Sequence, residues 1–501
     1  MKVIRILRLV LILGVPMLLL FFSDCKKEPI GNGKLSFSTD TLTFDTVFTT
    51  ISSTTQSFNV YNNSKKALIV SDIRLLHLAG TQFQINVDGD TVPSSGHFLN
   101  KEIPAHDSIK IFVTVTVNPN DQTNPFIILD AVQFITDGAV QKVYLQAFGQ
   151  NAYYHYGLEI KPGQTVNWDN KLPHVILSRD TEPGVLIDCN ATLNITSGCK
   201  VFVAPGAGIY VEGTLNAIAS DWQDSIIFRG VRLEQYYIDQ PGQWFGIVFL
   251  RNQCGTPPKG TFQRCIINES QYGIYAGAGL DTNLADYTGT AGQPSVTITQ
   301  CIVKNCQYNA VYGFNAIINS TNSLFYNSGS NLMQFGLGGT YSFNECTMYN
   351  IGSVYINHQD PNVLLSNFVT NGSNITYTQA LNSSFTDCII YGSLTNEISF
   401  NDVTGTAFTN AFNSCLLQTP GDTLAMFSTN NSATPNLLNQ NPLLVNPAGN
   451  NFTPYDTTAA GLWSPAIDFC TNGLQIDLFD NPRKHIHGPH IYDAGAVEAQ
   501  Q

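Results

Sequence analysis

Short runs in which apolar and polar residues alternate begin near residue 35 and continue to about residue 150. The alternation is clearest in residues 109–117, where every second side chain is apolar. A period of two predicts strands with one buried face. Clusters such as Asn-Asn, Asp-Gly and Asn-Pro separate the runs, so this region predicts a β-sandwich. The predicted strands include residues 41–47, 56–61, 68–76, 83–87, 108–117, 131–135 and 142–148.

A different pattern, six residues long, recurs further along the chain. Its copies are residues 262–267, 298–303, 320–325, 343–348, 385–390 and 412–417. In most copies the first, fourth and sixth residues are apolar or Cys, with polar residues between the first and the fourth. The fourth residues at 301, 323 and 346 are 22 and 23 apart, which predicts one turn of a β-solenoid per copy. The 42 residues from 346 to 388 then predict two turns.

The register of this pattern predicts a bend. Residues three apart in a straight strand face opposite sides, so the chain must turn if the first and fourth residues both point inward. Asn305, Asn327 and Asn350 then mark the next corner, where Asn tolerates left-handed backbone and can stack on its copies. The inward cysteines are expected to be buried free thiols, because parallel side chains in a stack are poorly placed for disulfides. Cys189 and Cys199 lie outside this column and are the pair to test for a disulfide.

Three further motifs resemble the opening of a family of right-handed parallel β-helix surface proteins. They are Ala204-Pro205-Gly206, Gly213-Thr214-Leu215 and Gly242-Gln243-Trp244-Phe245-Gly246-Ile247. With the repeats, the resemblance spans about residues 160–445 and implies the fold, while it implies nothing specific about activity.

The two ends of the mature chain also resemble known modules. Asn62-Asn63, Ile103-Pro104 and Asn118-Pro119 are similar to positions in Ig-like domains of the abnormal-spindle/Hydin type, which commonly act as spacers. Near the C-terminus, the chain resembles the "SPAID…NPR…DxGAxE" ending of many secreted β-helix proteins, which implies a cap that closes the solenoid. Within this ending, Arg483 with Asp468 or Glu498 is a candidate structural ion pair.

The first residues have the pattern of an export signal. Basic residues precede an apolar run at 9–22 that is short for a membrane span, and Cys25 follows directly. This resembles a bacterial lipobox, and the charged residues after Cys25 resemble the leader of Bacteroidetes surface lipoproteins, which implies lipidation at Cys25 and an outer-membrane, cell-surface location. The expected organisation is a signal peptide at 1–25, a linker at 26–34, the sandwich at 35–150, a connector and solenoid N-cap at 151–184, the β-helix at 185–445 and a capping segment at 446–501.

Composition supports this all-β interpretation and narrows the partners. Only 12% of residues are charged, and the net charge of -13 disfavours nucleic acid as a partner. No Cys/His cluster has zinc-finger spacing, and no cofactor motif is present, so no cofactor is expected. His485, His487 and His490 are weak candidates for a transition-metal site, and polar loop residues are the alternative.

Parallel β-helices often carry enzymes that cut polysaccharides, so acids on the repeat are candidate catalysts. Lys304 is the only Lys or Arg between Cys265 and Pro482, which argues against an eliminating lyase. Glu345 and Asp387 share one repeat position and would lie about 10 Å apart across two turns. Flexible side chains would bring the two carboxyl groups to the roughly 6.5–9.5 Å separation of an inverting hydrolase. The alternative is a pair of solvated corner residues; in the insertions, Asp281, Asp286 and Asp360 form no constellation.

The sequence therefore favours a surface-anchored binding or structural protein over an enzyme. A neutral glycan is the expected ligand, bound by amide and aromatic side chains on the β-helix. The aromatic candidates are Tyr272, Tyr275, Tyr308, Tyr312 and Trp244. The first alternative is a glycoside hydrolase, and the second is an adhesin with a protein partner, which an exposed apolar patch would favour.

Overall fold

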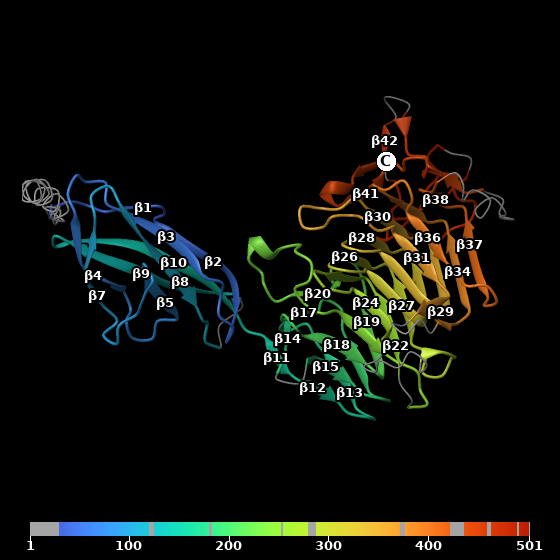
Figure 1. Ribbon diagram of the computed structural model, residues 1–501, viewed down its shortest axis with the longest axis horizontal. Coiled ribbons are helices and arrows are strands. Elements are labelled where there is room, and N and C mark those ends of the chain that lie inside the picture. The colour runs from blue at the N-terminus through green and yellow to red at the C-terminus, as the bar shows by residue number, and fades with distance from the viewer. Residues whose placement is uncertain are drawn as a thin grey trace, which may run out of the picture. The chain divides into compact units, whose positions relative to one another are not determined.

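The chain folds almost entirely as β-structure in two units. The computed structural model describes residues 30–119, 125–179, 183–251, 254–278, 287–370, 376–420, 435–457, 462–487 and 490–499. The units divide between Asn151 and Ala152 (Figure 1). Among the described residues, no helix has the length and apolar character needed to cross a membrane.

Unit 1 is a β-sandwich of two five-stranded sheets, as the alternating pattern predicts. In the order of pairing, one sheet contains β1 (Ser36–Phe37), β3 (Gln56–Tyr61), β8 (Ser108–Val115), β5 (Phe83–Val87) and β6 (Asp90–Thr91). The other contains β2 (Thr41–Phe48), β10 (Ala139–Gln150), β9 (Phe126–Thr136), β4 (Leu68–Leu75) and β7 (Phe98–Ile103). In β8 every second side chain is buried, so the period of two does mark the core of the sandwich.

Unit 2 is a parallel β-helix whose strands stack in three faces (Figure 1). Face A contains β11 (Tyr153–Tyr156), β14 (His174–Leu177), β17 (Lys200–Val203), β20 (Ile226–Gly230), β23 (Cys265–Asn268), β26 (Ile302–Cys306), β28 (Leu324–Ser328), β30 (Thr347–Asn350), β35 (Ile389–Gly392), β38 (Leu416–Leu417) and β39 (Leu437–Leu438). The first turn thus begins at β11, within the segment predicted to be a connector and N-cap.

Faces B and C are joined into one sheet by two long strands that belong to both, β27 (Val311–Thr321) and β29 (Met333–Asn344). Face B also contains β12 (Leu158–Ile160), β15 (Gly184–Ile187), β18 (Gly208–Val211), β21 (Ile247–Leu250), β24 (Ile274–Ala278), β31 (Val363–Ser366) and β36 (Ile398–Asn401). Face C also contains β13 (Thr165–Trp168), β16 (Thr192–Ile195), β19 (Thr214–Ile218), β22 (Lys259–Gln263), β25 (Ser295–Thr299), β34 (Leu381–Thr386) and β37 (Phe408–Asn413).

The six-residue repeat forms the corner between faces C and A, and the predicted bend is present. The third residue of every copy has a positive φ between 46° and 54°, which turns the backbone so that the residues on both sides point inward. We call these residues the corner column; they are Arg264, Gln300, Asn322, Glu345, Asp387 and Ser414. Inside the corner, the rings of Phe343 and Phe385 stack 5.2 Å apart, and those of Phe385 and Phe412 stack 4.8 Å apart.

The prediction of two turns between residues 346 and 388 is wrong. β29 pairs directly with β34, which places Phe343 beside Phe385, and β30 pairs directly with β35. The extra residues lie in insertions within a single turn, including the antiparallel hairpin of β32 (Phe368–Thr370) and β33 (Thr376–Thr378). Glu345 and Asp387 therefore occupy neighbouring turns, one strand spacing of about 4.8 Å apart.

Asparagines mark the next corner, between faces A and B, as predicted. Asn305 and Asn327 have positive φ, and the Asn327 amide donates to Asn305 Oδ1 (3.1 Å). The Asn350 amide donates to the Ser328 carbonyl (2.9 Å). These bonds tie successive turns together at a position where the chain leaves the strand.

The described parts of the C-terminal segment, residues 446–457, 462–487 and 490–499, lie along the outside of face A over successive turns. The segment contains the 3-10 turn η4 (Pro447–Gly449), β41 (Asn451–Pro454), which pairs with β40 (Leu444–Asn446), and the hairpin of β42 (Asp456–Thr457) and β43 (Leu462–Trp463). Phe452, Leu478 and Val497 pack against Leu324 and Tyr326 of β28. Because the later strands of face A, from β26 to β39, are covered in this way, their outward apolar side chains belong to two smaller cores.

Candidate functional site

Glu345 and Asp387, the weak candidates for a catalytic pair, lie beneath the C-terminal segment. Glu345 is fully buried, and its carboxylate accepts the backbone N–H of Leu474 (2.6 Å). Asp387 is 6% exposed, and its backbone carbonyl accepts the N–H of Gly495 (2.8 Å). Burial, with a smaller contribution from the neighbouring Glu345, raises the pKa of Asp387 to about 6. A polysaccharide cannot reach these carboxyl groups unless the segment is displaced, so their geometry is that of a structural contact.

The C-terminal segment binds the corner column turn by turn. Arg264 forms an ion pair with Asp480 (2.6 Å), Gln300 donates to the carbonyl of Asp477 (2.9 Å), and Asn322 donates to the carbonyl of Ile476 (2.8 Å). The polar side chains that the repeat places outside its bend are therefore the docking residues for the segment. This explains why the corner column contains different polar residues that share one backbone conformation.

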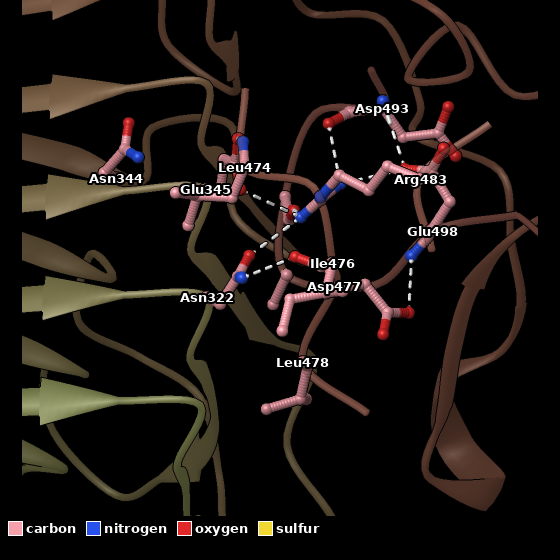
Figure 2. Close-up of polar contacts among 12 residues, drawn as sticks. Asn322, Asn344, Glu345, Leu474, Ile476, Asp477, Leu478, Arg483, Asp493 and Glu498 are labelled. Carbon is pink, nitrogen blue, oxygen red and sulfur yellow. Dashed lines mark hydrogen bonds and ion pairs between the residues drawn. The ribbon is translucent and has the colours of Figure 1, made fainter. Parts of the chain in front are cut away.

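Arg483 is the centre of this contact (Figure 2). Its guanidinium is fully buried and lies 2.9 Å from Glu498 and 3.3 Å from Glu345. It also donates to Asn322 Oδ1 (2.9 Å) and to the carbonyls of Asp493 (3.1 Å) and Gly495 (2.8 Å). Of the two partners predicted for Arg483, the structure shows the ion pair with Glu498. Asp468 instead accepts the N–H groups of Ile486 (2.7 Å) and His487.

The three histidines do not converge. His485 is exposed, His487 Nε2 lies 3.0 Å from Asp456, and the N–H of His490 donates to the Asp468 carbonyl (3.2 Å). Within the described ranges, they form no group of three or more metal-binding side chains.

The cysteines divide into a buried column and a surface pair. Cys265, Cys301, Cys346, Cys388 and Cys415 are fully buried free thiols, which confirms the prediction for the repeat. Each donates to the backbone carbonyl two residues earlier, at 3.1–3.5 Å, where the bend interrupts the strand. A thiol at this position therefore provides a hydrogen bond to a backbone carbonyl and also fills space in the core.

The prediction of a Cys189–Cys199 disulfide is wrong. Cys189 follows β15 near the surface and pairs with Cys254, 65 residues later. Cys199 is a free thiol that precedes β17 and points into the core of the β-helix, where it contributes to the main apolar cluster. The two side chains lie on opposite sides of the wall of the solenoid. Cys25, Asp281 and Asp286 lie outside the described residues.

An aromatic strip follows the outside of face B. It consists of Tyr210, Phe245, Tyr272, Tyr275, Tyr308 and Tyr312, with neighbouring ring centroids 4.6–6.0 Å apart. Tyr308 is 41% exposed and the other five rings are partly exposed, whereas Trp244 is buried and donates to the Asn268 carbonyl (2.8 Å). Burial raises the pKa of Tyr312 to about 12, so its hydroxyl remains a hydrogen-bond donor at neutral pH.

Hollows lie at both ends of the strip. One, of about 190 Å³, is beside Tyr210 and includes Leu186 and Glu159. The other, of about 200 Å³, we call the Tyr312 hollow. Its lining residues are Tyr312, Phe314, Gln334, Phe335, Gly336, Leu364, Ser366, Phe368, Val369 and Asn401, none of which is charged.

Gly336 leaves room for the Tyr312 hollow. A Cβ at this position would lie 3.3 Å from the ring of Phe314 and 3.6 Å from the hydroxyl of Tyr312. Phe368 and Val369, from the inserted hairpin of β32 and β33, form a wall at one side. The inserted hairpin, which lengthens the turn between Cys346 and Cys388, thus forms part of the hollow.

Sequence analysis missed a second group of acids, at the corner between faces A and B. Glu269 is fully buried and forms an ion pair with Arg229 (2.9 Å), and burial raises its pKa. Asp239 forms an ion pair with Lys304 (3.1 Å), and although burial acts to raise the pKa of Asp239, Lys304 lowers it. The backbone N–H of Asp239 also donates to Glu269 (2.9 Å). These contacts hold loop 231–243, which contains the 3-10 turn η1 (Gln235–Tyr237), against the solenoid and leave Glu269 inaccessible to a ligand.

Comparisons with known proteins add no assignment of family. No family model and no curated protein matches the chain. Similar solved structures include the catalytic unit of a thermostable GH87 α-1,3-glucanase from Streptomyces thermodiastaticus, which is 11% identical, with 71% of this chain and 76% of that chain covered and a TM-score of 0.20.

Two other solved structures have comparable scores. One is a family 123 glycoside hydrolase from Clostridium perfringens, which is 11% identical over 27% of this chain and 30% of that one, with a TM-score of 0.18. The other is PapD-like domain 7 of human CEP192, which is 14% identical over 24% of this chain and 87% of that one, with a TM-score of 0.16. At these scores the likenesses carry no argument, so the fold is assigned from the strand pairing and the site from its own geometry.

Proposed function

We propose that the β-helix binds a neutral glycan chain along the aromatic strip of face B. The observation that carries the proposal is a continuous row of partly exposed rings that ends in a hollow lined only by uncharged residues. Ligand sites typically combine aromatic and apolar walls with a few polar groups that fix orientation. Gln334, Ser366 and Asn401 are such groups in the Tyr312 hollow.

The dimensions suit an oligosaccharide. Tyr210, Val248, Tyr275 and Tyr312 follow one another in the register of four neighbouring strands, which gives a span of about 14 Å at about 4.8 Å per strand. The Tyr312 hollow extends this path over β29 and β31. An anionic glycan would find no cation in the lining of the hollow, so a neutral glycan is the better electrostatic match.

The lining of the hollow favours binding over hydrolysis. A glycoside hydrolase needs two carboxyl groups on either side of the scissile bond, and none of the ten lining residues has one. The buried pair Glu345 and Asp387 is committed to the C-terminal segment. Binding without cleavage is therefore the proposed activity.

The test uses the full chain with immobilised neutral and acidic polysaccharides, and it measures both retention and release of reducing ends. Loss of a buried aromatic contact costs about 1.5–3 kcal/mol, so Tyr312→Ala should weaken binding by roughly 10- to 100-fold. Gly336→Val, which fills the hollow, should weaken binding while the fold is kept. Tyr144→Ala, at a tyrosine of unit 1 that is 57% exposed, is the control and should bind like the parent chain.

Release of reducing ends by the parent chain would replace this proposal with a hydrolase. Retention that is unchanged in both Tyr312→Ala and Gly336→Val would place any glycan site elsewhere. Retention on acidic polysaccharides alone would contradict the electrostatic argument.

We also propose that the protein is held at the outer membrane by a lipid on Cys25. The support is the basic start, the short apolar run and the cysteine that follows it. In cells supplied with a labelled fatty acid, the chain should carry the label and fractionate with the outer membrane, and Cys25→Ser should carry none. Label on the Cys25→Ser chain would refute the assignment.

A further inference from the structure

Three side chains from successive turns converge at the corner between faces B and C. Cys189 follows β15, Glu212 follows β18 and Cys254 follows β21. One ligand atom from each lies within 4.8 Å of the other two. The sulfur of Cys189 lies 3.3 Å from a carboxylate oxygen of Glu212.

The surrounding contacts fix these residues in place. The backbone N–H of Cys189 donates to Asp188 Oδ1 (2.6 Å), which orients the start of this corner. The hydroxyl of Thr256 contacts Asn190 Oδ1, which holds the loop after Cys254 against the same corner.

We propose that Cys189, Glu212 and Cys254 form a binding site for one thiophilic divalent cation of the Zn²⁺ type when the two cysteines are reduced. Zinc binds thiolate at about 2.3 Å and carboxylate oxygen at about 2.0–2.2 Å in tetrahedral geometry, which places neighbouring sulfur and oxygen ligands about 3.5 Å apart. In the disulfide form, the Cys189 sulfur and the Glu212 oxygen lie 3.3 Å apart, which is close to this distance between two zinc ligands. Thiolate ligands select zinc over calcium or magnesium, which prefer oxygen alone.

The site exists only in the reduced form, since the structure joins Cys189 to Cys254 as a disulfide. An external thiol reductant supplies two electrons, which break the S–S bond, and two protons from solvent complete the two thiols. Each thiol then releases its proton to solvent as it binds the cation. The disulfide and the metal thus cross-link the same turns of the solenoid in alternative redox states.

The experiment compares the full chain in reduced and oxidised form after incubation with Zn²⁺ and gel filtration. The reduced chain should retain one equivalent of zinc, and the oxidised chain, recognised by a mass lower by two hydrogens, should retain none. With Co²⁺ in place of zinc, the reduced chain should show thiolate-to-cobalt absorption. Cys254→Ser should abolish binding, and Glu212→Gln should weaken it by at least about tenfold, as expected for loss of a group at a metal site.

Glu102→Gln, at an exposed glutamate of unit 1, is the matched control and should retain zinc like the parent chain. The proposal fails if the reduced parent retains no more zinc than Cys254→Ser, or if Glu212→Gln binds with unchanged affinity. It also fails if reduction exposes the buried repeat thiols to alkylation, because the three ligands are brought together only by the intact solenoid.

Discussion

Replacing Arg483 with Met tests whether the C-terminal segment is held by its buried ion pairs. The substitution keeps an unbranched apolar side chain but removes the charge that contacts Glu345 and Glu498, both fully buried. Removing one partner of a buried pair costs about 3–5 kcal/mol, because the remaining charge is left without compensation. At about 1.4 kcal/mol per power of ten, opening of the segment should become roughly a hundred- to a few thousand-fold more frequent.

The loss of stability caused by Arg483→Met should grow as the pH rises. Burial already raises the pKa of Glu345 and of Glu498 while Arg483 lowers it, so removing Arg483 lets both values rise further. A group whose pKa is raised by folding contributes stability that is present below its unfolded pKa and is lost as the pH rises through the folded value. Arg483→Met should therefore be most destabilising at neutral pH, and the difference from the parent should shrink toward pH 4, near the unfolded pKa of a carboxyl group.

Opening of the segment can be followed by hydrogen exchange at the N–H groups of Leu474 and Gly495, which donate to Glu345 and to the Asp387 carbonyl. Trp222, whose indole N–H donates to the Leu478 carbonyl, gives a fluorescence signal for the same contact. Lys484→Met is the control, since the exposed side chain of Lys484 is next in sequence. A loss below about 1 kcal/mol, or one that is independent of pH, would refute the view that these pairs hold the segment in place.

Three further predictions concern the repeat. Folding raises the pKa of Asp387 to about 6, so stability should fall as pH rises from about 4 to 6, and Asp387→Asn should flatten this part of a curve of denaturation midpoint against pH. Burial raises the pKa values of Cys346 and Cys388, so iodoacetamide at pH 8 should leave both unmodified in the native chain and label them after denaturation, and labelling of the native chain would contradict the buried column. Phe385→Ala should cost about 3–5 kcal/mol in chemical denaturation because the ring stacks between two others, and a cost below about 1 kcal/mol would argue against this stack.

The local geometry of the solenoid could be predicted because it repeats. The bend at the corner column follows from the spacing of inward residues, and six copies all have a positive φ there. The sequence predicts two turns between Cys346 and Cys388 because 42 residues match two turns in length, whereas the structure has one. No copy of the six-residue pattern lies between them, and that absence was the available signal for insertions within one turn.

The contacts that define the candidate sites are long-range and have no local pattern. Arg264 and Asp480 are 216 residues apart, and Cys189 and Cys254 are 65 apart. The sequence shows each of these residues, but the neighbouring residues do not indicate which distant residue each one contacts. The burial of Glu345 could not be predicted for this reason, since the covering segment lies more than a hundred residues further along the chain.

The three faces of the solenoid differ in what they leave available for a ligand. From β26 to β39, the outward side of face A is buried beneath the C-terminal segment. Face C carries mostly small polar side chains such as Asn194 and Thr297 in its outward positions. Face B departs from this regularity, since one column of its register reads Tyr210, Val248, Tyr275, Tyr312, Gln334 and Leu364. The aromatic strip includes Tyr210, Tyr275 and Tyr312 of this column, whose rings are partly exposed. A ligand site is therefore expected there and not at Glu345 and Asp387, which lie buried beneath the C-terminal segment.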